Sequence, residues 1–163
     1  MTESLGKKFE QYFKLNWKNC FPKTFIYRLP DMMGGYAGFA GSNPCDFICF
    51  PEAGKLFMLE LKEHKGNTIA WTAIRQYEKL LTYANLKHVF PGIIIWFSDH
   101  DKIIYCPIEE AKKMHDDGLK SINIKMLNEK LYNIIEIPTV KKRVFLEADY
   151  TVLLKLEERW YEW

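Results

Sequence analysis

Two acids and a lysine, Asp46, Glu60 and Lys62, are the residues of this sequence whose types and spacing suit catalysis. Carboxylate oxygens are ligands that Mg²⁺ prefers, and the ion usually takes only one or two protein carboxylates, while water and a substrate phosphate complete its shell. Hydrolysis of a phosphodiester requires a polarised phosphoryl oxygen, an activated water and stabilisation of the charge that grows on the leaving oxygen. A metal ion held by two carboxylates beside a lysine supplies all three.

The positions of these residues follow from a predicted β-hairpin. Segments 45–50 and 56–62 have strand-type composition, and the five residues between them carry a glycine near the end, as in a turn. In the expected register Phe50 pairs with Leu56 across this turn. Side chains alternate along a strand, so one face of the second strand should enter the core, with the side chains of Phe57, Leu59 and Leu61.

This register places Asp46 directly opposite Glu60, and Lys62 lies on the same face as Glu60. Like charges directly opposite on paired strands destabilise the pair by about 0.2–1 kcal/mol, so the two acids require a compensating cation. Lys62 is one candidate and a hard divalent ion is another. The alternative interpretation, which composition alone favours, is an ordinary solvated sheet face with a surface ion pair.

The other segments predict a mixed α/β (α+β) fold, in which helices pack on a sheet. Apolar residues at intervals of four, from Leu5 to Trp17, predict an amphipathic helix over residues 3–18. We also predict strands at 24–29, 92–98, 102–106 and near 143–146, and helices over about 72–85 with Thr72 as N-cap, from 107 through 114, and from about 149 to 161. No repeat or long linker interrupts the chain, so we expect a single domain over residues 1–163.

Two ordered motifs make the sequence recognisable, namely Asn43-Pro44-Cys45-Asp46-Phe47 and, after the hairpin turn, Glu60-Leu61-Lys62. They resemble the Asp…Glu-x-Lys core of the PD-(D/E)XK nuclease superfamily. More narrowly, the chain is similar to RecU-type Holliday junction resolvases, in particular to their compact phage-encoded relatives, in the runs GSNPCDFICF, GKLFMLELKEHKGNTIAW and IRQYEKLL. The resemblance covers residues 6 to about 121, and it implies a restriction-endonuclease-like core with a central mixed β-sheet flanked by helices.

The resemblance also implies a set of site residues. Asp46 and Glu60 would bind Mg²⁺ together with the backbone carbonyl of Leu61, and Mn²⁺ stays open as a substitute. Lys62 would orient or activate the attacking water and stabilise the charged phosphate. Glu10 on the first helix and Gln76 on the later helix would be supporting active-site residues. A resolvase cuts two strands related by symmetry, so a two-fold homodimer on a four-way DNA junction is the expected assembly.

The residues themselves leave alternatives open for the two supporting positions. Glu10 is also explained as a helix-surface acid that pairs with Lys14 four residues later. Gln76 is also explained as an amide at a helix boundary, satisfied by water or backbone. The chain departs from the larger family members at Pro44, where they have threonine, and the only candidate for their protruding stalk is the shorter segment 32–41.

Local charge carries the argument for a nucleic-acid partner, because the formal net charge is only +2. Tyr36 and Phe39, among the glycines of segment 34–41, are expected to stack on unpaired bases at a branch point or else to pack on the core. A further basic cluster is Lys141-Lys142-Arg143, and for any single lysine the rival is a solvated surface. The residues expected to contact DNA, tracking phosphates without reading bases, are Lys7, Lys8, Lys14, Arg28, Lys65, Arg75 and Lys79, together with Tyr36.

Several function classes find no support in the sequence. No apolar run approaches the roughly 20 residues of a membrane helix, and the start has no secretory segment, so we expect a cytoplasmic protein without a membrane partner. The four cysteines form no paired CxxC motif and are expected to be reduced and mostly buried. The four histidines have no zinc-ligand spacing, and neither GxxxxGK[ST] nor GxGxxG is present, so no nucleotide cofactor is expected.

These observations favour a metal-dependent crossover junction endodeoxyribonuclease that resolves Holliday junctions during recombination. Two other functions remain open from the sequence. One keeps the chemistry but changes the substrate, giving a restriction- or repair-type nuclease that acts on linear duplex DNA. The other is a non-catalytic, DNA-binding recombination accessory protein with a vestigial site.

Overall fold

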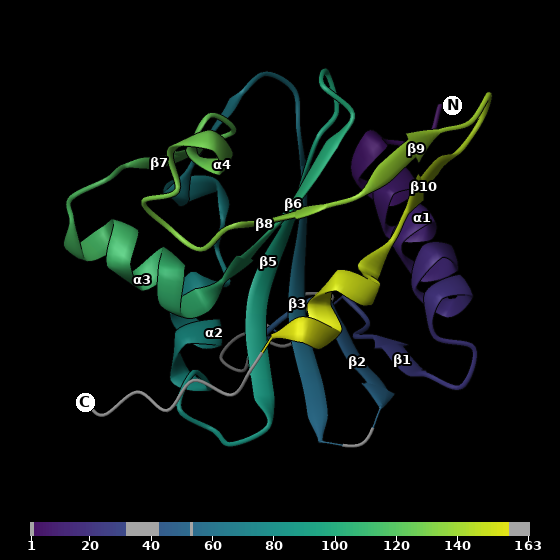
Figure 1. Ribbon diagram of the computed structural model, residues 1–163, viewed down its shortest axis with the longest axis horizontal. Coiled ribbons are helices and arrows are strands. Elements are labelled where there is room, and N and C mark those ends of the chain that lie inside the picture. The colour runs from purple at the N-terminus through teal and green to yellow at the C-terminus, as the bar shows by residue number, and fades with distance from the viewer. Residues whose placement is uncertain (1, 32–42, 53, 157–163) are drawn as a thin grey trace, which may run out of the picture.

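The computed structural model describes residues 2–31, 43–52 and 54–156 (Figure 1). The Gly-rich segment, with Tyr36 and Phe39, and the end of the expected last helix therefore lie outside the described residues. A six-stranded sheet forms the centre, in the order β1-β2-β3-β5-β6-β8. Its strands are β1 (Phe25–Arg28), β2 (Phe47–Glu52), β3 (Lys55–His64), β5 (Val89–Phe97), β6 (Lys102–Pro107) and β8 (Ile135–Ile137).

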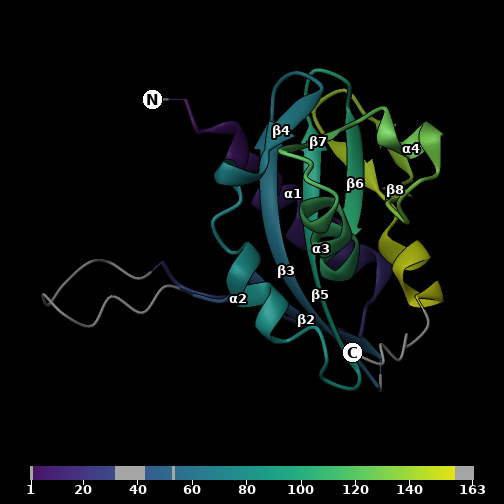
Figure 2. The same ribbon diagram turned by 90° about the vertical axis from the view of Figure 1, so that its left-hand side faces the viewer.

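The sheet is mixed, because β3 and β5 run parallel while every other neighbouring pair is antiparallel. Helices cover both of its faces (Figures 1 and 2). On one face lies α1 (Leu5–Cys20), and on the other lie α2 (Tyr77–Thr82) and α3 (Ile108–Asp116). The predicted fold class, a central mixed sheet flanked by helices, is confirmed.

Smaller elements complete the described structure. Two separate two-stranded sheets pair β4 with β7 and β9 with β10. None of the helices in residues 2–156 as described is long and apolar enough to cross a bilayer. The remaining bounds are β4 (Thr68–Ala70), η1 (Trp71–Ala73), β7 (Ser121–Asn123), α4 (Met126–Glu129), β9 (Thr139–Lys141), β10 (Leu146–Ala148) and η2 (Tyr150–Lys155), where η marks a 3₁₀ helix.

The apolar stripe of α1 packs against the sheet as its spacing predicts. Phe9, Phe13 and Trp17 are fully buried, and the side chain of Ser4 caps the helix by accepting a hydrogen bond from the Lys7 amide. Side chains of β3 alternate between the two cores, so Phe57, Leu59 and Leu61 join the cluster around α1, while Met58 joins the cluster around α2 and α3. Because both faces are covered, any polar side chain in the middle of β3 is removed from water.

The register of the β2–β3 hairpin is confirmed near the site and differs at the turn. Phe47 lies opposite Leu59, as the predicted register requires. The expected pairing of Phe50 with Leu56 is wrong, because the register shifts between Cys49 and Glu52, and both strands extend further toward the turn than predicted. An irregularity of this kind adds a residue on one strand, so the pairing beyond it is shifted by one residue, and Glu52 lies opposite Lys55.

Two other expectations on local structure are wrong, and a third falls only partly within the described residues. The helix expected over 72–85 is confined to α2, because Trp71 is anchored by its amide to the Lys120 carbonyl (3.1 Å) and Thr72 therefore lies in η1 rather than at an N-cap. The strand expected near 143–146 begins only at Leu146, since residues 142–145 form the turn between β9 and β10. The last helix is described only as η2, a 3₁₀ helix.

Candidate active site

Asp46 lies directly before β2, where its backbone and its side chain both bind neighbouring strands. Its amide donates to the Leu59 carbonyl of β3 (3.0 Å), and its carbonyl accepts from the Leu29 amide at the end of β1 (2.8 Å). Its carboxylate oxygen Oδ2 accepts a hydrogen bond from the Leu61 amide (2.8 Å). The carboxylate therefore continues the β2–β3 ladder beyond the end of β2, and its orientation is fixed.

Glu60 projects from the centre of β3 and is only 3% exposed. Burial, and then the nearby Asp46 carboxylate, raise the pKa of Glu60 to about 8, while Lys62 acts in the opposite direction. The predicted convergence of the two acids is therefore present, and the alternative of a solvated sheet face does not hold for Glu60.

Lys62 lies two residues after Glu60 on the same face of β3, as predicted. Its Nζ is 3.2 Å from Glu60 Oε1, and its side chain is 29% exposed, so the ammonium group links a buried acid to the solvent. The second oxygen, Glu60 Oε2, is buried and has no hydrogen-bond partner in the described part of the chain. An unpartnered buried carboxylate oxygen is costly unless a cation or a donor meets it.

The donor set at this position fits a hard divalent cation. Two carboxylates converge, and one of them has an oxygen that finds no hydrogen-bond partner among the residues described. The N–H and C=O of one strand residue point to the same side, so the Leu61 carbonyl faces the Asp46 side of β3, as its amide does. Within the described ranges no cluster of three or more His, Cys, Asp or Glu side chains could hold a metal ion by side chains alone. Mg²⁺ does not require such a cluster, because it usually binds only one or two protein carboxylates.

Glu10 approaches Asp46 from α1, and its charge contributes to a raised pKa of Asp46, after the larger effect of burial. Its partner is Arg28 at the end of β1, with Nε to Oε2 at 2.9 Å and Nη2 to Oε1 at 3.2 Å. The expected alternative, pairing with Lys14, is not what the structure shows. Arg28 also donates to Asp31 (3.0 Å), so its guanidinium group is occupied by two carboxylates.

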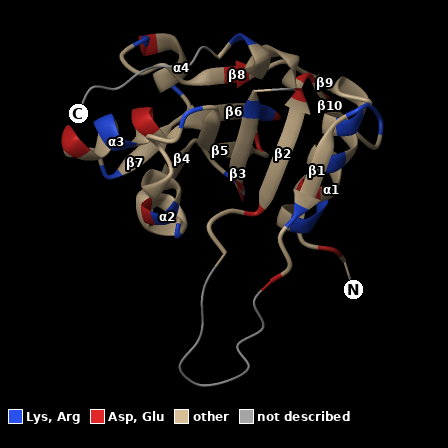
Figure 3. Cartoon of the chain, turned by 90° about the horizontal axis from the view of Figure 1, so that it is seen from below, with Lys and Arg blue, Asp and Glu red and all other residues tan. Residues whose placement is uncertain are grey.

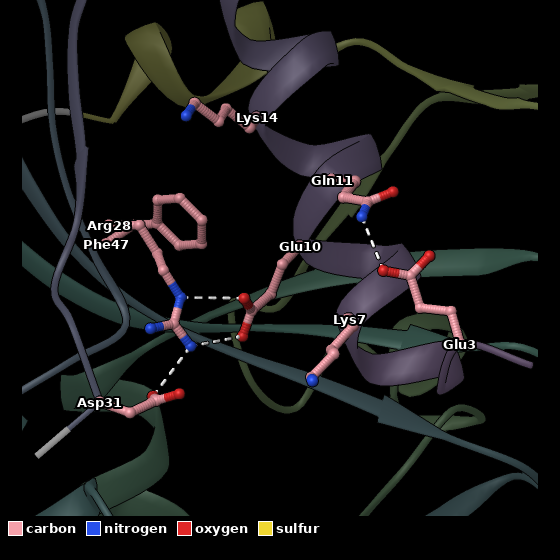
Figure 4. Close-up of a pocket in the computed structure, with 8 residues that line it drawn as sticks. All are labelled: Glu3, Lys7, Glu10, Gln11, Lys14, Arg28, Asp31 and Phe47. Atoms are coloured by element: carbon pink, nitrogen blue, oxygen red, sulfur yellow. Dashed lines mark hydrogen bonds and ion pairs between the residues drawn. The ribbon is translucent and has the colours of Figure 1, made fainter. Parts of the chain in front are cut away.

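A surface pocket of about 300 Å³ lies beside this ion pair (Figure 4). Figure 4 shows Arg28 bridging Glu10 and Asp31 at one end of the pocket, with Lys7 and Lys14 projecting from α1. The two exposed ammonium groups share the lining with three carboxylates and with Arg28, so the formal charges of the pocket balance. The lining residues are Glu3, Lys7, Glu10, Gln11, Lys14, Arg28, Asp31 and Phe47.

The other predicted site residues do not join this cluster in the described structure. Gln76 is half-buried at the N-cap of α2, and in the described part of the chain its side chain forms no hydrogen bond with Asp46, Glu60 or Lys62. Lys65 and Arg75 are exposed, and Lys79 is half-exposed on α2. Lys8 is exposed on α1, and Tyr36 lies outside the described residues.

Sequence reasoning missed the contact between Glu10 and Arg28 and the role of Asp31 in holding it. These residues lie on a helix, a strand and the segment after it, so no spacing rule relates them. The nearest signal was Arg28 itself, a charged residue in a predicted strand whose other residues are mostly apolar. Cys45 and Cys49 are buried and free, as predicted for small apolar side chains, and burial raises the pKa of Cys45 to about 12.

Comparison with known proteins gives one kind of match. No protein-family model matches the sequence, and no curated protein is significantly similar to it. Among solved structures, the chain is similar to Hjc, a Holliday junction resolvase from the hyperthermophilic archaeon Archaeoglobus fulgidus. The TM-score is 0.48 and the sequence identity 17%, over 64% of this chain and 78% of that chain.

Proposed function

We propose that this protein is a Mg²⁺-dependent endodeoxyribonuclease that cleaves branched DNA, with four-way junctions as its main substrate. The observation that carries this proposal is the buried Glu60, which lies beside Asp46 and Lys62 and has a carboxylate oxygen that no described residue meets with a hydrogen bond. The ordered motifs around these residues, which resemble those of RecU-type resolvases, support a restriction-endonuclease-like core and this substrate class. The geometry supports the chemistry, and the resemblance supports the substrate.

Asp46, Glu60 and the Leu61 carbonyl are the groups that would hold the metal. When bound, Mg²⁺ polarises a phosphoryl oxygen and makes a water more acidic. Asp46 contributes a fixed orientation, because the Leu61 amide holds its Oδ2. Glu60 contributes a desolvated charge, whose attraction for a cation is stronger than it would be in water.

Lys62 is the group placed to act on the substrate itself. Its ammonium carries three donors and is partly exposed on the same strand face as Glu60. In this position it can orient a water for attack, or donate to a phosphate oxygen and stabilise the negative charge that develops there. Lys62 would act on the reacting phosphate, whereas the two acids would hold the metal. Loss of the Lys62 ammonium group should therefore lower the rate of cleavage more than the affinity for DNA.

Substrate and assembly belong to the same proposal. Lys7 and Lys14 border the pocket beside Glu10 and are placed to contact phosphates on either side of the cleaved bond. A homodimer presents two such sites to the two symmetric strands of a junction. Mn²⁺ is expected to replace Mg²⁺, since both ions accept oxygen ligands. A recombination enzyme of this kind would act in the cytoplasm.

The test is cleavage of a labelled four-way junction by the wild type and by Asp46→Asn and Glu60→Gln, with and without Mg²⁺. We expect each substitution to abolish detectable cleavage while the protein still binds the junction. Glu129→Gln, at an exposed position on α4, is the matched control and should cleave normally. Unchanged cleavage by either site variant would discard the proposed site.

A competition experiment separates the substrate classes. If unlabelled linear duplex of equal length competes as well as the junction, the protein is a nuclease for linear DNA rather than a resolvase. If the wild type binds junctions but cuts nothing with any divalent metal, it is an accessory DNA-binding protein.

A further inference from the structure

The β9–β10 hairpin is a second feature of the chain that suits DNA, and it is docked rigidly on α1. Tyr12 of α1 donates through its hydroxyl to the Val144 carbonyl (2.9 Å), and its ring meets Phe145 edge-on at 5.0 Å between centroids. Asn16, only 2% exposed, donates through Nδ2 to the Leu146 carbonyl (2.9 Å). These contacts fix the position of the hairpin relative to the helix that carries Glu10.

The tip of this hairpin combines two cations with an exposed apolar side chain. Val144 is 80% exposed, although it lies next to a well-packed turn closed by the Lys142 amide and the Phe145 carbonyl (2.7 Å). Lys142 is more than half exposed and only 3.9 Å from an equally exposed Glu147, at the outer limit of an ion pair. Arg143 is exposed and has no ion pair with any residue that the structure describes.

The positive charge of the tip continues onto α1. The Lys8 ammonium lies 5.7 Å from the centre of the Tyr12 ring, and the same Tyr12 holds the hairpin turn. Figure 3 shows basic residues on the hairpin loop and along the neighbouring α1. By contrast, Lys141 at the base of the loop is neutralised by Asp101 at 2.7 Å. The positive charge of the hairpin that is weakly paired or unpaired among the described residues therefore lies at the tip, which we call the wing: Lys142, Arg143 and Val144.

We propose that the wing binds the duplex DNA that flanks the cleavage site, with Lys142 and Arg143 on phosphates and Val144 against the sugars and base edges of the minor groove. Apolar side chains beside Lys and Arg are a common means of contacting this groove. When Lys and Arg side chains contact DNA phosphates, they release the counterions bound there, and this release supplies a large share of the affinity for DNA. The choice of DNA as the ligand rests on the proposed function, whereas the exposed basic surface of the wing follows from the structure alone.

The wing extends the footprint away from the site rather than adding to the chemistry. Successive helix residues are about 100° apart, so Tyr12 and Lys8 face away from Glu10, which lies between them in sequence. A helix with its side chains is about 10–12 Å across. DNA held at Asp46 and Glu60 therefore meets the wing with a different stretch of its backbone, beyond α1.

The decisive experiment measures the salt dependence of junction binding by Lys142→Gln/Arg143→Gln in EDTA, so that no DNA is cut. Each phosphate contact contributes about 0.9 to the slope of log K against log[salt]. We expect the double substitution to lower the slope by about 2 and to weaken binding by about tenfold or more at low salt. Val144→Thr, which keeps the shape but replaces a methyl group with a hydroxyl, should weaken binding about two- to threefold without changing the slope.

The matched control is Lys125→Gln/Lys130→Gln, which removes the same charge from two exposed lysines that flank α4, far from the hairpin in Figure 1. This control should leave the slope unchanged. An unchanged slope in the wing variant, or an equal fall in both double variants, would overturn the wing. Thermal unfolding of each variant shows that the comparison is between folded proteins.

Failure of the wing and failure of the proposed function give different results. A wild type that cleaves junctions, together with a wing variant whose slope is normal, refutes only the wing. A wild type that binds DNA with a wing-dependent slope but never cleaves it refutes only the nuclease. A wild type that binds no DNA refutes both.

Discussion

The burial of Glu60 predicts an unusual dependence of stability on pH, which the Glu60→Gln variant exposes. In the folded protein, burial and then the Asp46 carboxylate raise the pKa of Glu60 from its usual 4.5 to about 8. Folding thus favours the protonated acid. The contribution of this group to the free energy of unfolding is fully present below about pH 4.5 and is lost as the pH rises through about 8.

The magnitude follows from the same two values. One pKa unit corresponds to about 1.4 kcal/mol, so ionising Glu60 without a metal costs the folded state about 3 kcal/mol at pH 7 and about 5 kcal/mol above pH 8. Glutamine has the shape of a protonated glutamate and does not ionise. We therefore expect Glu60→Gln to equal the wild type near the lower pH limit and to exceed it by a few kcal/mol in alkaline buffer.

The assay is urea denaturation in EDTA across this pH range, followed by tryptophan fluorescence. Glu129→Gln, which replaces an exposed acid, should follow the wild type at every pH. In a second arm, millimolar Mg²⁺ at about pH 8 should stabilise the wild type, because a bound ligand stabilises the folded state, and should leave Glu60→Gln unchanged.

A difference between wild type and Glu60→Gln that stays constant with pH would refute the reasoning. It would mean that the carboxyl ionises equally in the folded and unfolded chains and is therefore hydrated. Stabilisation of both proteins by Mg²⁺ would place the ion elsewhere.

Three further substitutions test other parts of the structure. Lys62→Met should slow junction cleavage by about 10²–10³-fold in single-turnover kinetics while leaving the binding isotherm unchanged, because the ammonium acts on charge formed in the reaction. Arg28→Lys breaks the two-pronged bond to α1 and should lower the free energy of unfolding by about 1 kcal/mol, whereas an unchanged value would mean that the pair is open in solution. Gly92→Ala should destabilise by about 1–3 kcal/mol, since a Cβ there lies 2.3 Å from the buried Tyr105 ring, while Gly6→Ala, with nothing within 4 Å, should not.

Elements whose apolar pattern extends over many residues could be predicted from the sequence. The four-residue stripe of α1 and the continuous apolar run of β5 both reflect burial, which is also what stabilises these elements. The alternation along β3 predicted that Phe57, Leu59 and Leu61 enter the core, but it did not predict that the opposite face is covered as well. The register near Phe47 followed from the same alternation, because slipping by one residue would move every side chain to the wrong face.

Short elements could not be predicted in the same way. β4, β7 and β8 have three residues each, too few to show a period, and tertiary contacts define them. The helix expected over 72–85 is shorter than predicted, because tertiary contacts bury Trp71 and Ile74 in and beside the 3₁₀ turn η1, ahead of α2. The ion pair of Glu10 with Arg28 joins elements whose approach depends on how α1 packs on the sheet.

The candidate site shows most clearly what the sequence left undecided. Composition alone favoured a solvated ion pair over a metal site for Asp46, Glu60 and Lys62, because spacing on a strand places side chains on a face but says nothing about water. The fold decides between them by covering both faces of β3, so that Glu60 loses its hydration and, among the residues that the structure describes, has only Lys62 as a cationic partner. One ammonium group satisfies one carboxylate oxygen, and Asp46 adds a second negative charge to the same place. The remaining imbalance is what a divalent cation would remove, so the cost to stability and the proposed chemistry have a single physical origin.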